Sequence, residues 1–319
     1  MPGIIAELTN HCNMKCKHCL DERHSADGYL SLDNLKIVLQ NAKRYGFTYI
    51  SLTGGEPTLH PEFIEILERT SSIGYEVGFV TNAWNFVDLY RRSHETLSKV
   101  DIITFSLDGA NDSTHDNLRR AGSFRRVLQA ISICAVKNIP FSVNSVITAQ
   151  NYIEIEDIVK LAFELGSRGV RFGFLMPTEL SLSENLVFSR SELKNIQDAV
   201  TEIQKKCKMP VILAPGFFNT NLFPCAPLQH EEFNIDWKAN ITLCCHISGY
   251  GNGSSLNDVI GNLNEISFSK AIGKFKKLVL QFRKNKNDHH NTKQFLDEHY
   301  FPCLYCLNYF EKATECLIN

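Results

Sequence analysis

The sequence lacks the long apolar run that a membrane helix needs. Its longest apolar runs have only the length of a strand, far short of the ~20 residues that cross a bilayer. It also lacks an excess of one charge: 33 basic and 35 acidic residues give a net charge of −2. No surface for nucleic acid or for an anionic membrane is therefore predicted.

A secretory signal is also absent. A cysteine-rich loop begins at residue 12, where the hydrophobic region and cleavage site of a signal peptide would lie. Without such a signal, the eleven cysteines indicate a reducing compartment and metal ligation rather than a disulfide framework. We therefore expect a cytoplasmic protein.

The 319 residues suggest about two domains, and apolar segments of strand type alternate with helical ones. We expect strands near residues 3–9, 48–53, 75–81, 101–107, 140–148 and 169–175, and helices near 31–45, 60–72, 85–98, 122–137 and 151–166. Strands separated by helices pair in parallel through right-handed crossovers. The predicted fold is α/β: a partial (β/α)6 TIM-like barrel over 1–208 and a small α+β region over 209–319.

Three cysteines follow the first predicted strand: Cys12, Cys16 and Cys19. A cubane iron–sulfur cluster has four irons, so three cysteines leave one iron without a protein ligand. A zinc site is the alternative, since short cysteine runs in cytosolic proteins hold either kind of metal.

The second predicted strand runs into Gly54-Gly55-Glu56-Pro57. Together with the cysteine spacing, Cys-x3-Cys-x2-Cys, this motif resembles the radical S-adenosylmethionine (SAM) enzymes. The resemblance implies a [4Fe–4S] cluster with SAM at its open iron. It also implies that the backbone of Gly54, Gly55 and Glu56 grips the SAM amino group, and glycine permits such a close approach. A plain turn is the alternative.

The resemblance implies further cofactor contacts at later strand ends. The residues that match are Thr81, Asn82, Ser106, Asp108 and Arg119. Arg119 would pair with the SAM carboxylate, which a guanidinium fork fits bidentately, although a surface arginine is usually only solvated. His18 occupies a position near the adenine where many relatives have tyrosine or phenylalanine, and this departure leaves its role open.

The pattern changes beyond residue 176. We expect a helix near 189–207, a short strand at 210–214, a hairpin over 233–243 and a long helix near 267–285. The Lys/Asn/His-rich stretch 282–291 is predicted to be a solvated loop.

Cysteines become dense again in this C-terminal part, which resembles the twitch and SPASM extensions of radical SAM enzymes. The resemblance implies an auxiliary [4Fe–4S] cluster on Cys225, Cys244, Cys303 and Cys306. Only Cys316 remains beyond these ligands, so the shorter twitch form is expected. Structural zinc is the alternative, because four cysteines also make zinc sites.

Cys245 stands beside a predicted ligand, in a part of the chain expected to face the barrel mouth. A free cysteine usually serves as a small buried hydrophobe. Alternatively, its thiol could give a hydrogen atom to a carbon radical, as in some epimerases of this family. Cys134 and Cys207 fall on helical patterns and are expected in the core, and Cys316 has no assigned role.

The resemblance implies reductive cleavage of SAM to a 5′-deoxyadenosyl radical that takes hydrogen from an unactivated carbon. An external one-electron reductant of flavodoxin or ferredoxin type would be its partner. Epimerisation with Cys245 as hydrogen donor is the favoured reaction; dehydrogenation or crosslinking through the auxiliary cluster is the alternative, and a non-catalytic iron–sulfur or zinc protein is a remote one.

The early position of the cysteine loop favours a compact substrate, either a peptide or a small natural product. The family member that acts on GTP is disfavoured because residues 315–319 do not form its Gly-Gly tail.

Overall fold

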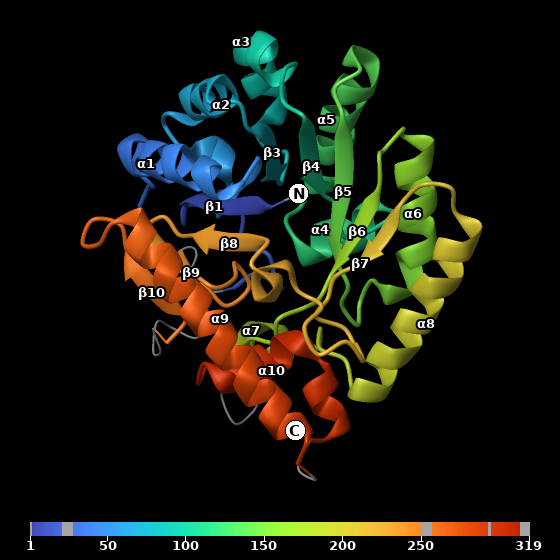
Figure 1. Ribbon diagram of the computed structural model, residues 1–319. Helices are drawn as coiled ribbons and strands as arrows, with labels where there is room; N and C mark the ends of the chain where they lie inside the picture. Colours follow the sequence, from blue (N-terminus) through green and yellow to red (C-terminus); the bar gives the residue numbers. More distant parts are fainter. Residues whose placement is uncertain (1, 21–27, 251–256, 293–294, 313–319) are drawn as a thin grey trace.

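The computed structural model describes residues 2–20, 28–250, 257–292 and 295–312 (Figure 1). Its strands form one ten-stranded sheet in the order β10-β9-β8-β1-β2-β3-β4-β5-β6-β7. The strands are β1 Gly3–Thr9, β2 Tyr49–Gly54, β3 Glu76–Thr81, β4 Ile102–Ser106, β5 Phe141–Val146, β6 Val170–Gly173, β7 Val211–Leu213, β8 Glu232–Ile235, β9 Asn240–Thr242 and β10 Val259–Asn262.

The helices are α1 Leu32–Ala42, α2 Phe63–Ser72, α3 Phe86–Leu97, α4 Asp112–Leu118, α5 Ser123–Lys137, α6 Ile155–Glu164, α7 Glu179–Ser183, α8 Arg190–Lys206, α9 Phe268–His290 and α10 Pro302–Tyr309. The helices up to α8 come between strands, whereas α9 and α10 follow the last strand. Strands β1 to β6 are parallel neighbours in chain order. The predicted partial (β/α)6 barrel is therefore confirmed.

Two short helices, α4 and α7, were not expected from the sequence. Both are too short to show a helical period, and both begin at capping side chains. Asn111 Oδ1 accepts a hydrogen bond from Thr114 N at 3.0 Å, and Thr178 forms a capping box with Ser181. Such caps satisfy amide groups that a helix start would otherwise leave unpaired.

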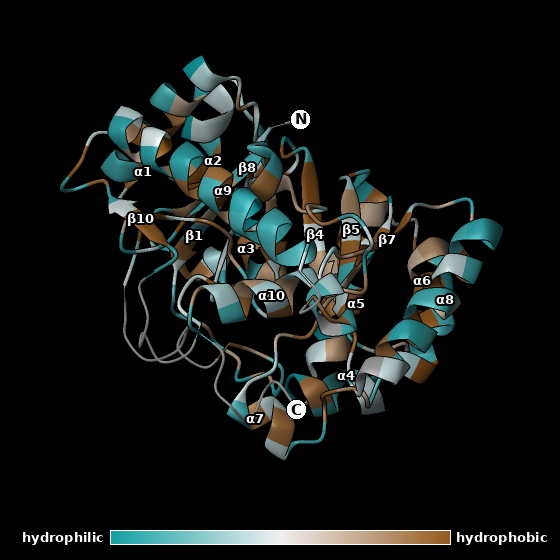
Figure 2. Ribbon diagram, turned by 60° about the horizontal axis from the view of Figure 1, so that its bottom comes forward, coloured by the Kyte–Doolittle hydropathy of each residue, from teal (hydrophilic) through white to brown (hydrophobic). Residues whose placement is uncertain are grey.

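Side chains alternate across the sheet, as the period of a strand requires. On β1, Ile4, Ala6 and Leu8 are fully buried in the main core with the helices, and the strands are largely apolar in Figure 2. The other face is more polar. Asn234 Nδ2 donates to Glu7 Oε1 at 2.9 Å, and the interior of the partial barrel is therefore lined in part by polar groups.

The C-terminal region extends the same sheet at both edges. Strand β7 pairs with β6, and β8 lies parallel to β1, beside it in Figure 1. Strands β8 and β9 form the expected antiparallel hairpin. The sheet thus continues past residues 208 and 209, where we expect the boundary between the two domains. That domain boundary remains a prediction.

Helix α9 extends further than the sequence analysis expects. It runs to His290, so the stretch 282–291 is mainly helical and is not a solvated loop. The reason is packing: Phe282 and Lys286 are both buried in the midst of this polar segment. Across the described ranges, no helix combines the length and apolar character needed to span a bilayer.

Candidate functional site

The first cysteine loop leaves the sheet where β1 ends, at the edge where the parallel strands have their carboxyl ends. The main chain that follows β2 fastens it: Gly55 N donates to Thr9 O at 2.7 Å and Glu56 N donates to His11 O at 2.8 Å. A Cβ atom on Gly54 or Gly55 would clash with the carbonyl oxygens of Thr9 or His11. The glycine pair therefore lets two strand ends come into backbone contact.

The Glu56 carboxylate ties the end of β2 to the end of β3. It accepts hydrogen bonds from Thr81 Oγ1 at 2.8 Å, Thr58 Oγ1 at 2.6 Å and Asn82 N at 2.8 Å. Burial raises the pKa of Glu56, and these hydrogen bonds oppose the rise. The side chains of Glu56 and Thr81 thus bond to the protein's own groups and support the loop.

Asn82 connects this support to the cysteine loop itself. Its Nδ2 donates to Asn13 Oδ1 at 2.8 Å and lies 3.7 Å from Cys12 Sγ. The expected site residue Asn82 is therefore beside the first cysteine.

Asp108 is the centre of a buried charge network on the other side of the loop. It forms an ion pair with Arg119, and its Oδ2 lies 3.3 Å from His18 Nε2. Its Oδ1 accepts from Val146 N at 2.8 Å. Burial alone would raise the pKa of Asp108, but Arg119 and His18 outweigh it and hold the pKa below its usual value.

Arg119 extends from this network to the cysteines. One Nη lies 3.9 Å from Cys16 Sγ, and the nearby carboxylate and thiols raise its pKa despite burial. His18 is buried, and burial lowers its pKa to about 4. Ser106 is buried at the end of β4. The structure thus gathers all the expected cofactor residues at one edge of the sheet.

The three thiols of the loop suit a metal centre that binds them as thiolates. Burial raises the pKa of Cys12 to about 12 and that of Cys16 to about 11, so they are neutral thiols until a cation or metal favours the charged form. The N–H groups of Asn82 and Arg119 already face two of the three sulfurs.

Several buried polar atoms around the loop have no hydrogen-bond partner in the described part of the chain. They are Asn10 Nδ2, Asn13 Nδ2, His18 Nδ1 and His115 Nε2. Buried polar atoms are usually satisfied, so a set of unpartnered ones indicates a site for another molecule. Three thiols with these polar groups fit the implied [4Fe–4S] cluster and SAM.

A second cysteine group comes from the C-terminal region. Cys225 precedes β8, Cys244 follows β9, and Cys303 and Cys306 belong to α10. Burial raises the pKa of Cys303, and the nearby sulfurs of Cys225, Cys306 and Cys245 add to this rise. Cys303 in turn acts to raise the pKa of Cys244. The structure therefore brings together all four expected ligands, with Cys245 beside them.

Neither cysteine group forms a ready site for one ion. Over the described ranges, no three His, Cys, Asp or Glu side chains converge closely enough to hold a single metal ion. The metal assignment of both groups rests on their cysteine content and on the charges around them.

The second cysteine group lies against two different parts of the sheet. Cys303 Sγ lies close to Gly216 and Phe174, which follow the carboxyl ends of β7 and β6. Strand β9 runs antiparallel to β8, with Ile241 opposite Ile235 and Thr242 opposite Asn234. The chain therefore reaches Cys244 and Cys245 at the edge where β1 and β8 begin, away from the loop after β1. The expectation that Cys245 faces the barrel mouth therefore stays a prediction.

Of the remaining cysteines, Cys134 is fully buried in the core of α5 and Cys207 packs against the core, as expected. Cys316 lies outside the described residues.

Sequence reasoning missed His115, whose Nδ1 accepts from Asp108 N at 3.1 Å, and the buried Lys286. Neither stands in a distinctive motif, so only their burial reveals them.

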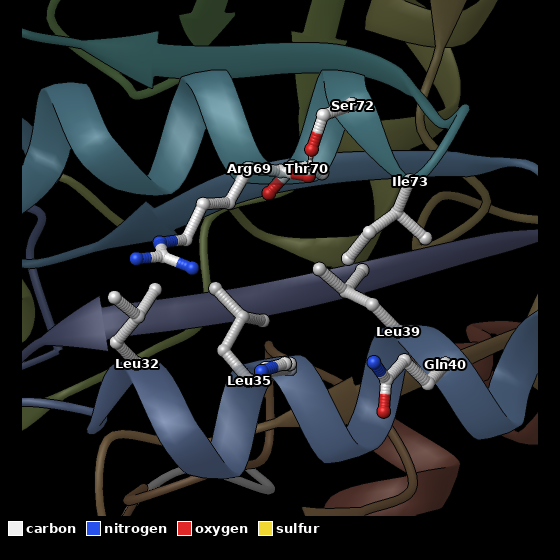
Figure 3. A pocket seen from close by; sticks show the side chains of 9 residues that line it. Leu32, Leu35, Leu39, Gln40, Arg69, Thr70, Ser72 and Ile73 are labelled. Carbon is white, nitrogen blue, oxygen red and sulfur yellow. Dashed lines mark hydrogen bonds between the residues drawn. The ribbon is translucent and has the colours of Figure 1, made fainter.

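A separate hollow of about 150 Å³ lies between α1 and α2 (Figure 3). Leu32, Leu35 and Leu39 from α1 face Arg69 and Ile73 from α2 there. Its lining contains no cysteine, histidine or carboxylate, so it lacks the chemistry of the two cysteine groups.

Comparison with known proteins identifies the family. Residues 6–162 match the model of the radical SAM superfamily. The chain belongs to the radical SAM superfamily. This radical SAM domain includes all three cysteines of the first loop and the strand ends described above. Membership implies a [4Fe–4S] cluster and SAM as cofactors.

Two curated relatives show where the likeness lies. The chain is 32% identical over 227 residues to the AdoMet-dependent heme synthase of Methanosarcina barkeri, covering 68% of this chain and 63% of the relative. It is 30% identical over 203 residues to a probable GTP 3′,8-cyclase of Saccharolobus solfataricus, covering 62% and 64%. The radical SAM chain thus spans less than two thirds of the length of these relatives.

Solved structures share its fold. Streptococcus suis SuiB bound to precursor peptide SuiA superposes with a TM-score of 0.68 at 16% identity, covering 84% of this chain and 63% of SuiB. The protein anSMEcpe with bound AdoMet and Kp18Cys peptide gives 0.66 at 15% identity, covering 94% and 88%. These likenesses confirm the radical SAM fold.

Proposed function

We propose that this radical SAM enzyme acts on an unactivated C–H bond of a peptide or small natural product. When bound, the [4Fe–4S] cluster and SAM supply, after one-electron reduction, a 5′-deoxyadenosyl radical that abstracts a hydrogen atom. The observation that carries the proposal is the gathering of Cys12, Cys16 and Cys19 with the Asp108–Arg119 pair at one sheet edge.

The chain's own residues would position these groups. The thiolates of the first loop would be ligands, and the backbone of Gly54, Gly55 and Glu56 would hold the SAM amino group. Arg119 would offer its remaining N–H groups to the SAM carboxylate while Asp108 orients it. The unpartnered Nδ1 of His18 would lie near the adenine, with Thr81, Asn82 and Ser106 completing the surroundings.

We assign the second cysteine group to an auxiliary [4Fe–4S] cluster in a twitch-type region. Its ligands would be Cys225, Cys244, Cys303 and Cys306. The gathering of these four thiols from three separate segments supports the assignment, and zinc remains the competing metal.

Epimerisation is the favoured reaction. Cys245 lies near Cys303 of the second group, and in the proposed reaction its thiol would deliver a hydrogen atom to the face of the substrate radical opposite the abstraction. An electron from an external one-electron reductant of flavodoxin or ferredoxin type, together with a proton from solvent, would then return the sulfur radical to the thiol. Dehydrogenation or crosslinking, with the auxiliary cluster taking the electron, is the second candidate because that cluster would lie beside Cys245.

The substrate is proposed only as a class. The chain resembles a heme synthase and a GTP cyclase in sequence, and its structural neighbours SuiB and anSMEcpe hold peptides. The partly polar interior of the barrel suits a compact polar molecule or an extended peptide segment.

The decisive test combines metal analysis with SAM turnover. Anaerobically reconstituted protein should contain about eight irons per chain, as expected for two cubanes, and should form 5′-deoxyadenosine after reduction. The triple variant with Cys12, Cys16 and Cys19 changed to Ala should keep about four irons and form none. A wild-type protein that binds iron yet never cleaves SAM would refute the proposal, and four irons with one zinc would reassign the second group.

A second test concerns Cys245. The Cys245→Ala variant should still form 5′-deoxyadenosine with substrate present but should yield no epimer. Cys207→Ala is the matched control, because Cys207 packs against the core at the end of α8 and is not one of the proposed ligands. Normal product from the Cys245 variant would exclude it as hydrogen donor.

A further inference from the structure

Lys286 is a lysine buried in the middle of α9. Only 1% of it is exposed, and its Nζ lies 4.5 Å from the centre of the Tyr305 ring. Tyr305 stands between Cys303 and Cys306 on α10, and its ring lies 5.8 Å from that of Phe282 on α9. In Figure 1 these two helices lie together in the lower part of the molecule. Helix α9 thus presents a buried ammonium group to the helix that carries two cysteine ligands.

The other buried lysine of the described chain, Lys312, is paired with a carboxylate. Lys312 Nζ lies 2.8 Å from Asp258 Oδ1, and it donates to Ile247 O at 2.7 Å. Both side chains of this pair are almost completely buried. No such pair with a carboxylate forms at Lys286 within the part of the chain that the structure describes.

Burial lowers the pKa of Lys286, and the nearby sulfurs of Cys306, Cys225 and Cys303 oppose this decrease when they are charged. Burying an ammonium ion without a counter-charge is costly, and buried charges are therefore paired or placed beside metals. Neutral thiols would not compensate this charge, whereas thiolates bound to a metal would. The exposed Arg171 also faces Cys225 and Cys303, but solvent weakens its effect.

We propose that Lys286 is a positioning residue that compensates the negative charge of the second cysteine group and raises the reduction potential of the metal centre bound there. This inference rests on the proposed auxiliary cluster. A fixed positive charge stabilises the reduced form more than the oxidised form, because reduction adds negative charge. Iron–sulfur potentials depend on such charge and on solvent exposure.

The test uses the full chain with Cys12, Cys16 and Cys19 changed to Ala, so that only the second group binds iron. Lys286→Met keeps the length of the side chain and removes the charge, and Lys286→Arg keeps the charge. Lys284→Met is the matched control, since Lys284 is exposed on the same helix. Iron content and the midpoint potential, followed by electron paramagnetic resonance, are measured for each.

One-electron reduction should become at least tenfold less favourable in Lys286→Met, a shift of 59 mV to more negative potential by the one-electron conversion. Lys286→Arg and Lys284→Met should keep the parent value. If Lys286→Met loses its iron while Lys286→Arg retains it, the need for the charge is equally supported. A Met variant with the parent potential, or an Arg variant that behaves like Met, would overturn the inference. Absence of iron from the parent protein would instead refute the auxiliary cluster.

Discussion

Asp108 connects four segments of the chain that hold the first cysteine loop. Its carboxylate meets Arg119, His18 and the main chain of β5, and its carbonyl oxygen accepts from Asn151 Nδ2 at 2.9 Å. The carboxylate is fully buried, so its charge depends on these partners. This one residue therefore sets both the local stability of the site and the position of an arginine beside Cys16.

At this residue, the first prediction concerns Arg119→Gln. The change leaves the Asp108 charge buried without its main partner, which typically costs about 3–5 kcal/mol of unfolding free energy. Urea unfolding of wild type and variant measures the difference. Arg125→Gln, on an exposed position of α5, should change stability by no more than about 0.5 kcal/mol.

The same variant gives a pH prediction. Because the pKa of Asp108 is lowered in the folded protein, its stabilising effect is complete above the ordinary aspartate pKa and is lost as the pH falls through the lowered value. The stability gap between wild type and Arg119→Gln should therefore shrink below about pH 4. A gap that stays constant into strong acid would contradict the role of this ion pair.

Among the elements, the end of β2 is packed too closely against the first cysteine loop to accept a side chain on Gly54 or Gly55. The Gly54–Gly55 backbone lies directly against the start of the cysteine loop, and Gly54 has φ of +129°, which favours glycine. The ends of β1 and β2 thus meet here without any intervening side chain.

Gly55→Ala should displace the cysteine loop, because its Cβ atom would overlap the His11 carbonyl oxygen. We expect loss of iron from the first group and a fall in stability of a few kcal/mol, typical of overpacking. Gly273→Ala on α9 is the control: no atom lies near its added Cβ, so it should be neutral or stabilising by up to about 1 kcal/mol. Equal iron content in both variants would argue against the steric role.

How far the sequence predicts the elements depends on their length and surroundings. The six strands of the barrel were predictable because each is an apolar run between helical patterns. Helix α4 was not, because it is short and depends on the Asn111 cap. The helical end of α9 was missed because its composition is polar, although Phe282 and Lys286 face inward. Family motifs predicted a set of residues that the structure gathers at the carboxyl ends of the strands, but not His115 or Lys286, whose partners are distant in sequence.

In the whole molecule, one sheet joins the two cysteine groups. The first group lies where the parallel strands end, and the second includes Cys303, which lies close to the segments that follow β6 and β7. Strand β8 completes this arrangement by pairing with β1 over four registered residue pairs.

A chain that ends at residue 208 should therefore aggregate. It loses β7 and β8 and leaves the edges of β6 and β1 unpaired, and open edges promote association. Size-exclusion chromatography would detect this, with a chain ending at residue 312 as the control. A monomeric, folded 1–208 fragment would support the expected boundary at 208 and 209 as a true domain limit.

The pairing of β8 with β1 also has a consequence for biosynthesis. Ribosomes add roughly 5–20 residues per second, so Ile4 waits on the order of ten seconds or more before its neighbour Phe233 has been translated. During that interval the nascent barrel carries an open margin next to its first cysteines. An open margin of this kind promotes pairing with other chains until translation delivers β8.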